Sequence, residues 1–424
     1  MKTSNFSDTV GAVRFPATVD ASVATAPYLL RQPVSDREQK LLGYELRWSQ
    51  ATAADKSSGS SDLTRLLDRL NAIDPARPLG DKALVFADCT DADLALDLQG
   101  FGLADRVVLQ LPKLAPANIA AALPRVQRLR DQGFHLALGA QALHPAYASW
   151  MPLVEFVFLD ASAEPTKVAL AIKQLGQSRK INVIAQRVVT RELCTGALEL
   201  GFGGLMGPYF AQMPASVRSA ANPAQATLIQ LIALVQREAD VSEIEQVLRH
   251  DPALSFKMLR YVNSAGFGTG REISSFGHAV MLMGYKPLVR WLTMVLATVT
   301  DGSGAGMLSR MAVVRARLLE LLAQDAGLAA EKDNAFILGA FSLMDVMLRQ
   351  PLDRVLKQVV LPEAVRDALL HRAGSLGKLL RMAENCERWV TDAAAPADDW
   401  MGMAVQSVTE RHLEALAWSE SLGI

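Results

Sequence analysis

The sequence has few cysteines, few aromatic residues and almost no net charge. Cys89, Cys194 and Cys386 are too few and too widely spaced for a disulfide framework or a zinc site, and they fit a reducing compartment. Lys and Arg together number 43 against 44 Asp and Glu, so the net charge is −1. This balance gives no electrostatic reason to expect direct nucleic-acid binding.

Long hydrophobic runs are also missing. No segment reaches the roughly 18 consecutive apolar residues that a membrane-spanning helix needs. The first residues contain no continuous apolar stretch of the kind found in signal peptides. We therefore expect a cytoplasmic protein without membrane association, with a flexible N-terminus over residues 1–25.

The first half of the chain alternates short apolar runs with helical patterns. A length of 424 residues is long for a single core and predicts two domains. The apolar runs are residues 83–86, 107–109, 135–138, 156–159 and 181–185, and the amphipathic stretches between them are 62–73, 115–132, 164–177 and 191–200. Such alternation indicates parallel strands covered by helices. It leaves an α/β barrel and a doubly wound sheet as alternatives.

Two apolar runs at residues 28–30 and 41–44 flank a polar turn and predict a β-hairpin. Within it, Gln32-Pro33 followed by Gly43-Tyr44-Glu45-Leu46 resembles the opening of the EAL domain, the cyclic-di-GMP phosphodiesterase barrel. The resemblance implies an α/β TIM-like barrel over residues 26–214. It also implies that Gln32 stands at a nucleotide contact and Glu45 at a metal ligand.

The resemblance can be followed along the carboxyl ends of the strands, where barrel enzymes place their chemistry. Asp88 falls where the family has an Asn, and Asp160 matches an Asp of the family. The family's other charged site positions are occupied by Gln110, Gly139-Ala140, Phe158, Gln186 and Val189. Two divalent ions held by so few carboxylates would be loosely bound. We therefore expect a degenerate barrel with no catalytic residues, no bound metal and no cofactor.

The polar residues that remain are interpreted as a vestigial ligand pocket, made of Gln32, Glu45, Arg47, Asp88 and Asp160. Gln32 would favour cyclic-di-GMP binding without hydrolysis. Arg47 would too, if a small deletion shifts it onto the family's phosphate-contacting Arg. Phe158 and Met206 on the pocket floor argue against binding, because a phosphate without partners is costly to desolvate.

The second half of the chain has a different character. After a stretch rich in Pro, Ala and Ser at residues 208–223, helical periodicity dominates. Residues 251–268, DPALSFKMLRYVNSAGFG, together with residues 273–276 and 279–284, resemble the HDOD domain. The resemblance implies an all-α helical domain over residues 215–424, with its core at about 220–415. HDOD domains are related in fold to HD-type phosphohydrolases but lack their metal-binding His and Asp residues.

Further segments at residues 338–345, 361–365 and 376–380 resemble two-domain EAL-HDOD signalling proteins. The resemblance implies a non-catalytic adaptor that binds regulatory or signalling proteins in a bacterial cyclic-di-GMP-related network. The candidate partner groove contains Asn263, Ser264 and Phe267. Two alternatives remain: a cyclic-di-GMP receptor that does not hydrolyse its ligand, and a residual metal-dependent phosphodiesterase.

Overall fold

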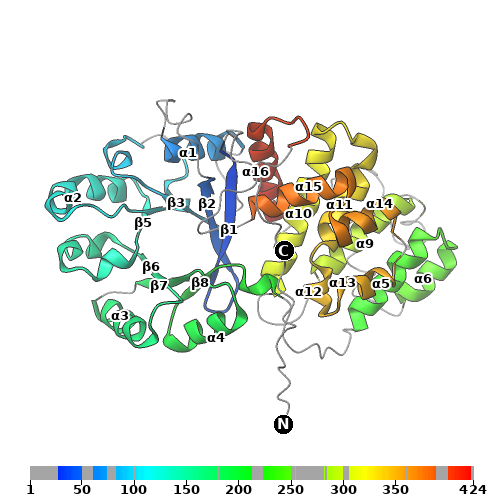
Figure 1. Cartoon of the computed structure of the whole chain (residues 1–424), viewed down its shortest axis with the longest axis horizontal. Helices are drawn as coiled ribbons and strands as arrows, with labels where there is room; N and C mark the ends of the chain where they lie inside the picture. The colour runs from blue at the N-terminus through cyan, green and yellow to red at the C-terminus, as the bar shows by residue number, and fades with distance from the viewer. Residues whose placement is uncertain are drawn as a thin grey trace, which may run out of the picture.

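The structure is a computed structural model that describes residues 27–49, 61–73, 83–98, 101–178, 181–212, 223–249, 254, 281, 284–298, 305–359, 361–387 and 400–421. A closed eight-stranded barrel is followed by a helical domain that packs beside it (Figure 1). The closed sheet decides for the barrel and against the doubly wound alternative. The expected multidomain architecture is thus confirmed.

The strands follow chain order around the barrel. They are β1 (Leu29–Asp36), β2 (Leu41–Trp48), β3 (Leu84–Asp88), β4 (Val107–Gln110), β5 (His135–Leu138), β6 (Phe156–Asp160), β7 (Asn182–Gln186) and β8 (Gly204–Met206). β1 runs antiparallel to both β2 and β8, and the other neighbouring strands are parallel. The three-residue β8 was not among the expected strands, because so short a run has no recognisable period.

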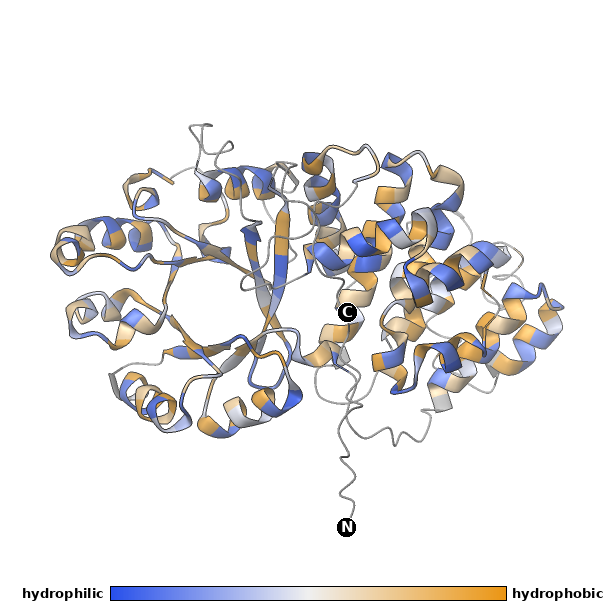
Figure 2. Ribbon diagram, viewed as in Figure 1, coloured by the Kyte–Doolittle hydropathy of each residue, from blue (hydrophilic) through white to orange (hydrophobic). Residues whose placement is uncertain are grey.

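Four helices lie on the outside of the barrel. They are α1 (Asp62–Ile73), α2 (Pro116–Asp131), α3 (Pro165–Ser178) and α4 (Arg191–Leu200). The bounds of α1 and α4 equal those predicted from apolar periodicity, and α2 and α3 differ by one residue at each end. Figure 2 shows hydrophobic residues along the strands and faces of mixed character on these helices.

The predicted hairpin is confirmed. β1 and β2 pair from Leu29 opposite Trp48 to Ser35 opposite Leu41, with an irregularity between Val34 and Ser35. In the turn, the backbone N–H of Lys40 donates to Oδ1 of Asp36 at 2.8 Å. The hairpin register places Gln32 directly opposite Glu45.

The barrel interior is an apolar layer. Its buried members are Val34, Phe86, Val108, Ala137, Phe156, Phe158, Ile184 and Met206. The ring of Phe86 meets those of Phe156 and Phe158 edge-on, with centroids 5.4 and 5.7 Å apart. Such packing leaves little room for charged groups, and the inward-facing polar side chains of β3, β4, β6 and β7 lie at the ends of these strands.

The second domain is built from helices in the part of the chain that the structure describes. They are α5 (Pro223–Gln236), α6 (Val241–Arg249), α9 (Tyr285–Thr298), α10 (Ala305–Asp325), α11 (Lys332–Phe341), α12 (Met344–Leu348), α13 (Leu352–Leu356), α14 (Glu363–His371), α15 (Gly374–Cys386) and α16 (Val405–Ser421). The long α10 contacts α9, α11, α15 and α16. None of the described helices is long and apolar enough to cross a lipid bilayer.

Candidate functional site

Polar residues end several barrel strands and form a rim at the mouth. Asp88 ends β3 opposite Gln110 at the end of β4, and Asp160 ends β6 opposite Gln186 at the end of β7. Side chains alternate along a strand, so Asp88 shares the inward face with Phe86 two residues earlier. The same argument places the other three above the apolar interior.

Gln32 and Glu45 lie opposite each other on the hairpin strands, just below this rim, and Glu45 is also opposite Phe86 of β3. Both are buried, with 2% and 3% of their surfaces exposed. Oε2 of Glu45 has no hydrogen-bond partner among the described residues. Burial raises the pKa of Glu45 to about 8, with a further contribution from the charge of Asp88 and an opposing one from Arg47. At neutral pH the Glu45 carboxyl is therefore mostly protonated.

The other two carboxylates of the predicted pocket are paired with arginines. Nη1 of Arg47 lies 3.9 Å from Oδ2 of Asp88, and Arg187 forms an ion pair with Asp160. Oδ1 of Asp160 also accepts hydrogen bonds from the backbone N–H and the hydroxyl of Ser162, at 2.9 and 2.7 Å. Burial raises the pKa of Asp88, while the charge of Arg47 opposes the rise.

Arg187 is a mouth residue that sequence reasoning missed. It follows the last residue of β7 and has a φ of 59°, in the left-handed region that non-glycine residues seldom adopt. This backbone conformation belongs to the turn after β7, and nothing in the local residue types indicates it. The Arg187 side chain is 55% exposed beside Asp160.

The predicted pocket residues fall into two groups. Gln32, Glu45, Arg47 and Asp88 come from the adjacent strands β1, β2 and β3. Asp160 ends β6, which stands four strands from β2 in the closed barrel. The pocket is therefore spread over opposite sides of the mouth.

These residues do not fit the two-metal site that the EAL resemblance implies. Asp88 lies 3.9 Å from a guanidinium nitrogen of Arg47, Asp160 pairs with Arg187, and Gln110 and Gln186 bring no charge to the ends of β4 and β7. Phe158 and Met206, expected on the pocket floor, lie buried in the barrel interior. No cluster of three or more His, Cys, Asp or Glu side chains suited to a metal ion occurs in the described ranges.

Two features of the helical half fall outside the described residues. One is the candidate partner groove of Asn263, Ser264 and Phe267. The other is an adjacent His-Asp pair, His250-Asp251, which precedes the HDOD-like signature. The structure therefore tests neither of them.

Comparisons with known proteins agree with this architecture. Residues 223–346 match the model of the HDOD domain. The chain is 26% identical over 401 residues to the cyclic di-GMP phosphodiesterase CdgJ of Vibrio cholerae, which covers 93% of both chains. It is 22% identical over 414 residues to the uncharacterized protein YuxH of Bacillus subtilis, covering 93% of this chain and 98% of that one.

Among solved structures, the EAL enzyme Bd1971 with bound cAMP and cyclic-di-GMP is similar at a TM-score of 0.36 and 17% identity. The match covers 44% of this chain and 61% of that one. A closed eight-stranded barrel thus precedes a helical domain in which residues 223–346 match the HDOD model.

Proposed function

We propose that this protein is a non-catalytic signalling adaptor that acts through protein–protein contacts in a cyclic-di-GMP-related network. The observation that carries the proposal is the state of the mouth carboxylates. One is mostly protonated, and two are engaged by arginines. The similarity to CdgJ, named as a cyclic di-GMP phosphodiesterase, supports the choice of network.

The chemistry explains why such a mouth suits binding better than hydrolysis. A metal-assisted attack on a phosphodiester needs ionised oxygen ligands that hold the metals and lower the pKa of bound water. Gln110 and Gln186 bring no charge to the ends of β4 and β7. A metal would also have to displace Arg47 and Arg187 from their carboxylates.

A hydrolysis assay on the full chain tests the catalytic part of the proposal. We expect no turnover of cyclic-di-GMP above background with magnesium, manganese or calcium, and no thermal shift with the metals alone. Glu45→Gln is the matched variant, because it removes the buried carboxyl of the hairpin without changing its size. Hydrolysis by the natural protein that Glu45→Gln abolishes would overturn the proposal.

Binding of partner proteins, the other half of the proposal, is tested with purified proteins. Proteins captured by the full chain should each form a complex of defined stoichiometry when mixed with it in purified form. A set of captured proteins that all fail to bind in isolation would contradict an adaptor role.

The exposed arginines favour a second candidate, a nucleotide receptor. The side chains of Arg47 and Arg187 are 40% and 55% exposed above an interior that contains Phe86 and Phe158. A guanidinium that pairs with a carboxylate can exchange it for a phosphate, which offers similar oxygen geometry.

Calorimetric titration with cyclic-di-GMP distinguishes the receptor from a pure adaptor. A receptor would bind without added metal, and Arg187→Gln would weaken binding by about tenfold, the equivalent of about 1.4 kcal/mol. Gln32→Ala and Arg47→Gln test the side of the mouth formed by the hairpin. If no heat of binding is detected, the receptor is excluded and the adaptor is the function that remains.

A further inference from the structure

Strand β1 has two faces that serve different parts of the molecule. Gln32 shares a face with its partner Glu45, and it also borders the cavity at the domain boundary. Its neighbour Arg31 points the opposite way, toward the helical domain, and is 3% exposed. A shift of this one strand therefore moves a mouth residue and an interdomain residue together.

Arg31 enters a buried network of charges that extends through the helical domain. Its Nη2 lies 2.8 Å from Oε1 of Glu387, which follows α15. Oε2 of Glu387 accepts hydrogen bonds from Arg315 of α10, with contacts of 2.6 and 2.7 Å. Nη1 of Arg315 donates to Oγ of Ser342 at 3.0 Å, next to α11. One strand of the barrel is thus connected to three helical segments.

Helix α16 holds the rest of the hairpin. The backbone N–H of Leu29 donates to Oγ1 of Thr409 at 3.3 Å, in a buried contact. The hydroxyl of Tyr44 donates to Oε1 of Glu420 at 3.3 Å, and the same carboxylate pairs with Arg310 of α10. The hairpin is therefore anchored to the helical domain at three places by polar contacts.

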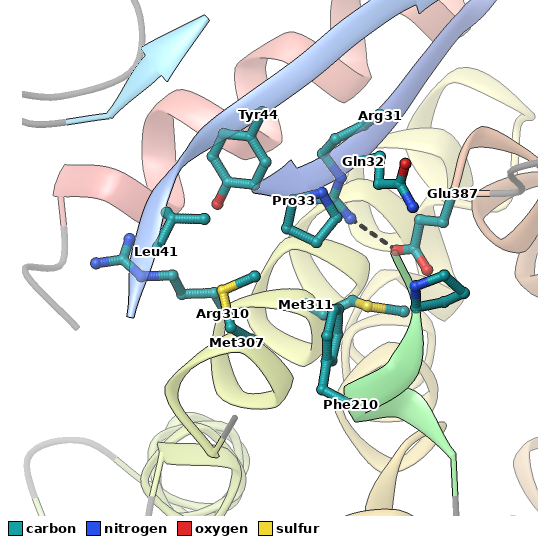
Figure 3. A pocket seen from close by; sticks show the side chains of 11 residues that line it. Arg31, Gln32, Pro33, Leu41, Tyr44, Phe210, Met307, Arg310, Met311 and Glu387 are labelled. Carbon is teal, nitrogen blue, oxygen red and sulfur yellow. Dashed lines mark hydrogen bonds and ion pairs between the residues drawn. The ribbon is translucent and has the colours of Figure 1, made fainter. Parts of the chain in front are cut away.

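The space between these anchors is incompletely packed. A cavity of about 20 Å³, enough for one or two waters, lies between the hairpin, α10 and the short turn at Tyr209–Ala211. Figure 3 shows the Arg31–Glu387 pair at its edge, with Pro33, Phe210, Met307 and Met311 around it. Methionine side chains change rotamer easily and repack without much loss. Met307 and Met311 therefore give the contact between the hairpin and α10 two side chains that can repack.

We propose that β1 is a coupling strand, which transmits changes at the barrel mouth to α15 and α10 through the Arg31–Glu387–Arg315 network. The element that switches is the ion pair between Arg31 and Glu387 beside the cavity, which is either formed or shifted. An occupant or charge at Gln32 and Glu45 changes this ion pair, and the helical domain responds. The purpose of this coupling rests on the adaptor function proposed above, whereas its test does not.

Hydrogen exchange of the full chain, without ligand or partner, tests the coupling. Gln32→Glu places a second carboxyl opposite Glu45 and disturbs the mouth from β1. We expect exchange in α15 to change by about fivefold or more, the lower end of typical coupling between sites. In an Arg31→Met background the same substitution should have little further effect on α15.

Gln110→Glu is the matched control, because it makes the same change at the mouth on β4, outside the hairpin. It should alter exchange in the barrel and leave α15 unchanged. Helix α6 lies far from the hairpin along the chain and serves as an internal reference. Its exchange should stay constant in both variants, which would exclude global destabilisation. If Gln32→Glu or Arg31→Met does not fold, Gln32→Ala and Arg31→Gln replace them. Unchanged α15 in Gln32→Glu, or an equal effect of Gln110→Glu, would overturn the proposal.

Discussion

Glu45 lies directly opposite Gln32 across the β1–β2 ladder, and both side chains are almost completely buried. A carboxyl group in such a place ionises reluctantly, because water cannot solvate its charge. Two charges act on Glu45: that of Asp88 raises its pKa, and that of Arg47 lowers it. The mouth of this barrel therefore carries a largely neutral acid where the family resemblance implies a metal ligand.

Glu45 should make stability depend on pH. Its pKa is about 8 in the folded state against 4.5 for the free group, so the folded protein binds this proton more tightly. The stability that the proton contributes is present below about pH 4.5 and is lost as the pH rises toward 8. Glu45→Gln does not lose stability in this way. The unfolding free energy of the variant should therefore rise relative to that of the natural protein across that window, by up to about 1.4 kcal/mol per pH unit.

Denaturant unfolding at several pH values across the window measures this effect. Glu164→Gln, at an exposed position before α3, is the control and should show no such trend. A constant difference between Glu45→Gln and the natural protein at all pH values would refute the assignment.

His412 of α16 should make the protein less stable at acid pH. It is completely buried, and both of its ring nitrogens are shielded from water. Burial, together with the charge of Arg31, lowers its pKa to about 3, against a smaller opposing effect of the Leu29 backbone. The unfolded chain therefore takes up the proton first, and stability falls as the pH drops from 6.5 toward 3.

His412→Leu removes the titrating group and keeps a similar volume. In acid, the unfolding free energy of the variant should fall less steeply with pH than that of the natural protein, and the two slopes should differ by about one bound proton. At neutral pH the variant should be at least as stable as the natural protein. Urea unfolding between neutral and acid pH measures the slopes, with His371→Gln at the exposed end of α14 as control. Equal slopes for His412→Leu and the natural protein would show that another group is responsible.

Glu387 should be the most sensitive carboxylate at the domain boundary. It is 7% exposed and shared by two arginines that are themselves buried. Glu387→Gln leaves both guanidinium groups without a charge partner and should cost about 3–5 kcal/mol of unfolding free energy. Glu410→Gln breaks the more exposed pair with Arg69 and should cost about 1 kcal/mol or less. Similar losses from both substitutions, measured by denaturant unfolding, would contradict the role of burial.

Gly339 should tolerate no side chain. A Cβ at this position of α11 would lie 2.5 Å from the backbone nitrogen of Ala316 in α10, so the two helices would have to separate. Gly339→Ala should destabilise the protein by about 1–3 kcal/mol. Gly176→Ala in α3 meets no atom within 4 Å and should stabilise it by about 0.5–1 kcal/mol. Thermal unfolding of both variants gives the comparison, and a shift of the same sign in both would be inconsistent with the close helix contact.

Much of the barrel could be predicted because its signals are local. The bounds of α1 and α4 follow from apolar residues three and four apart, and β5 was predicted with its observed bounds. Asp240 and Glu243 have the spacing of a capping box at the start of α6, but the structure forms this box only in part. Asp240 accepts from the N–H of Ser242 at 2.9 Å, but Glu243 pairs with Arg237 instead of closing the box. Arg237, six residues earlier and just after α5, holds that carboxylate, and the spacing within α6 does not show this.

The sequence by itself determined the two-domain order, the hairpin, and the residue types at the strand ends, since these depend on period and on identity along the chain. Only the tertiary structure decided that the sheet closes, that Arg187 meets Asp160, and that Arg31 and Arg315 share Glu387. These pairs join residues that lie 27 to 356 positions apart, counted from Asp160 to Arg187 and from Arg31 to Glu387. Such contacts depend on how whole elements pack, which no local pattern encodes.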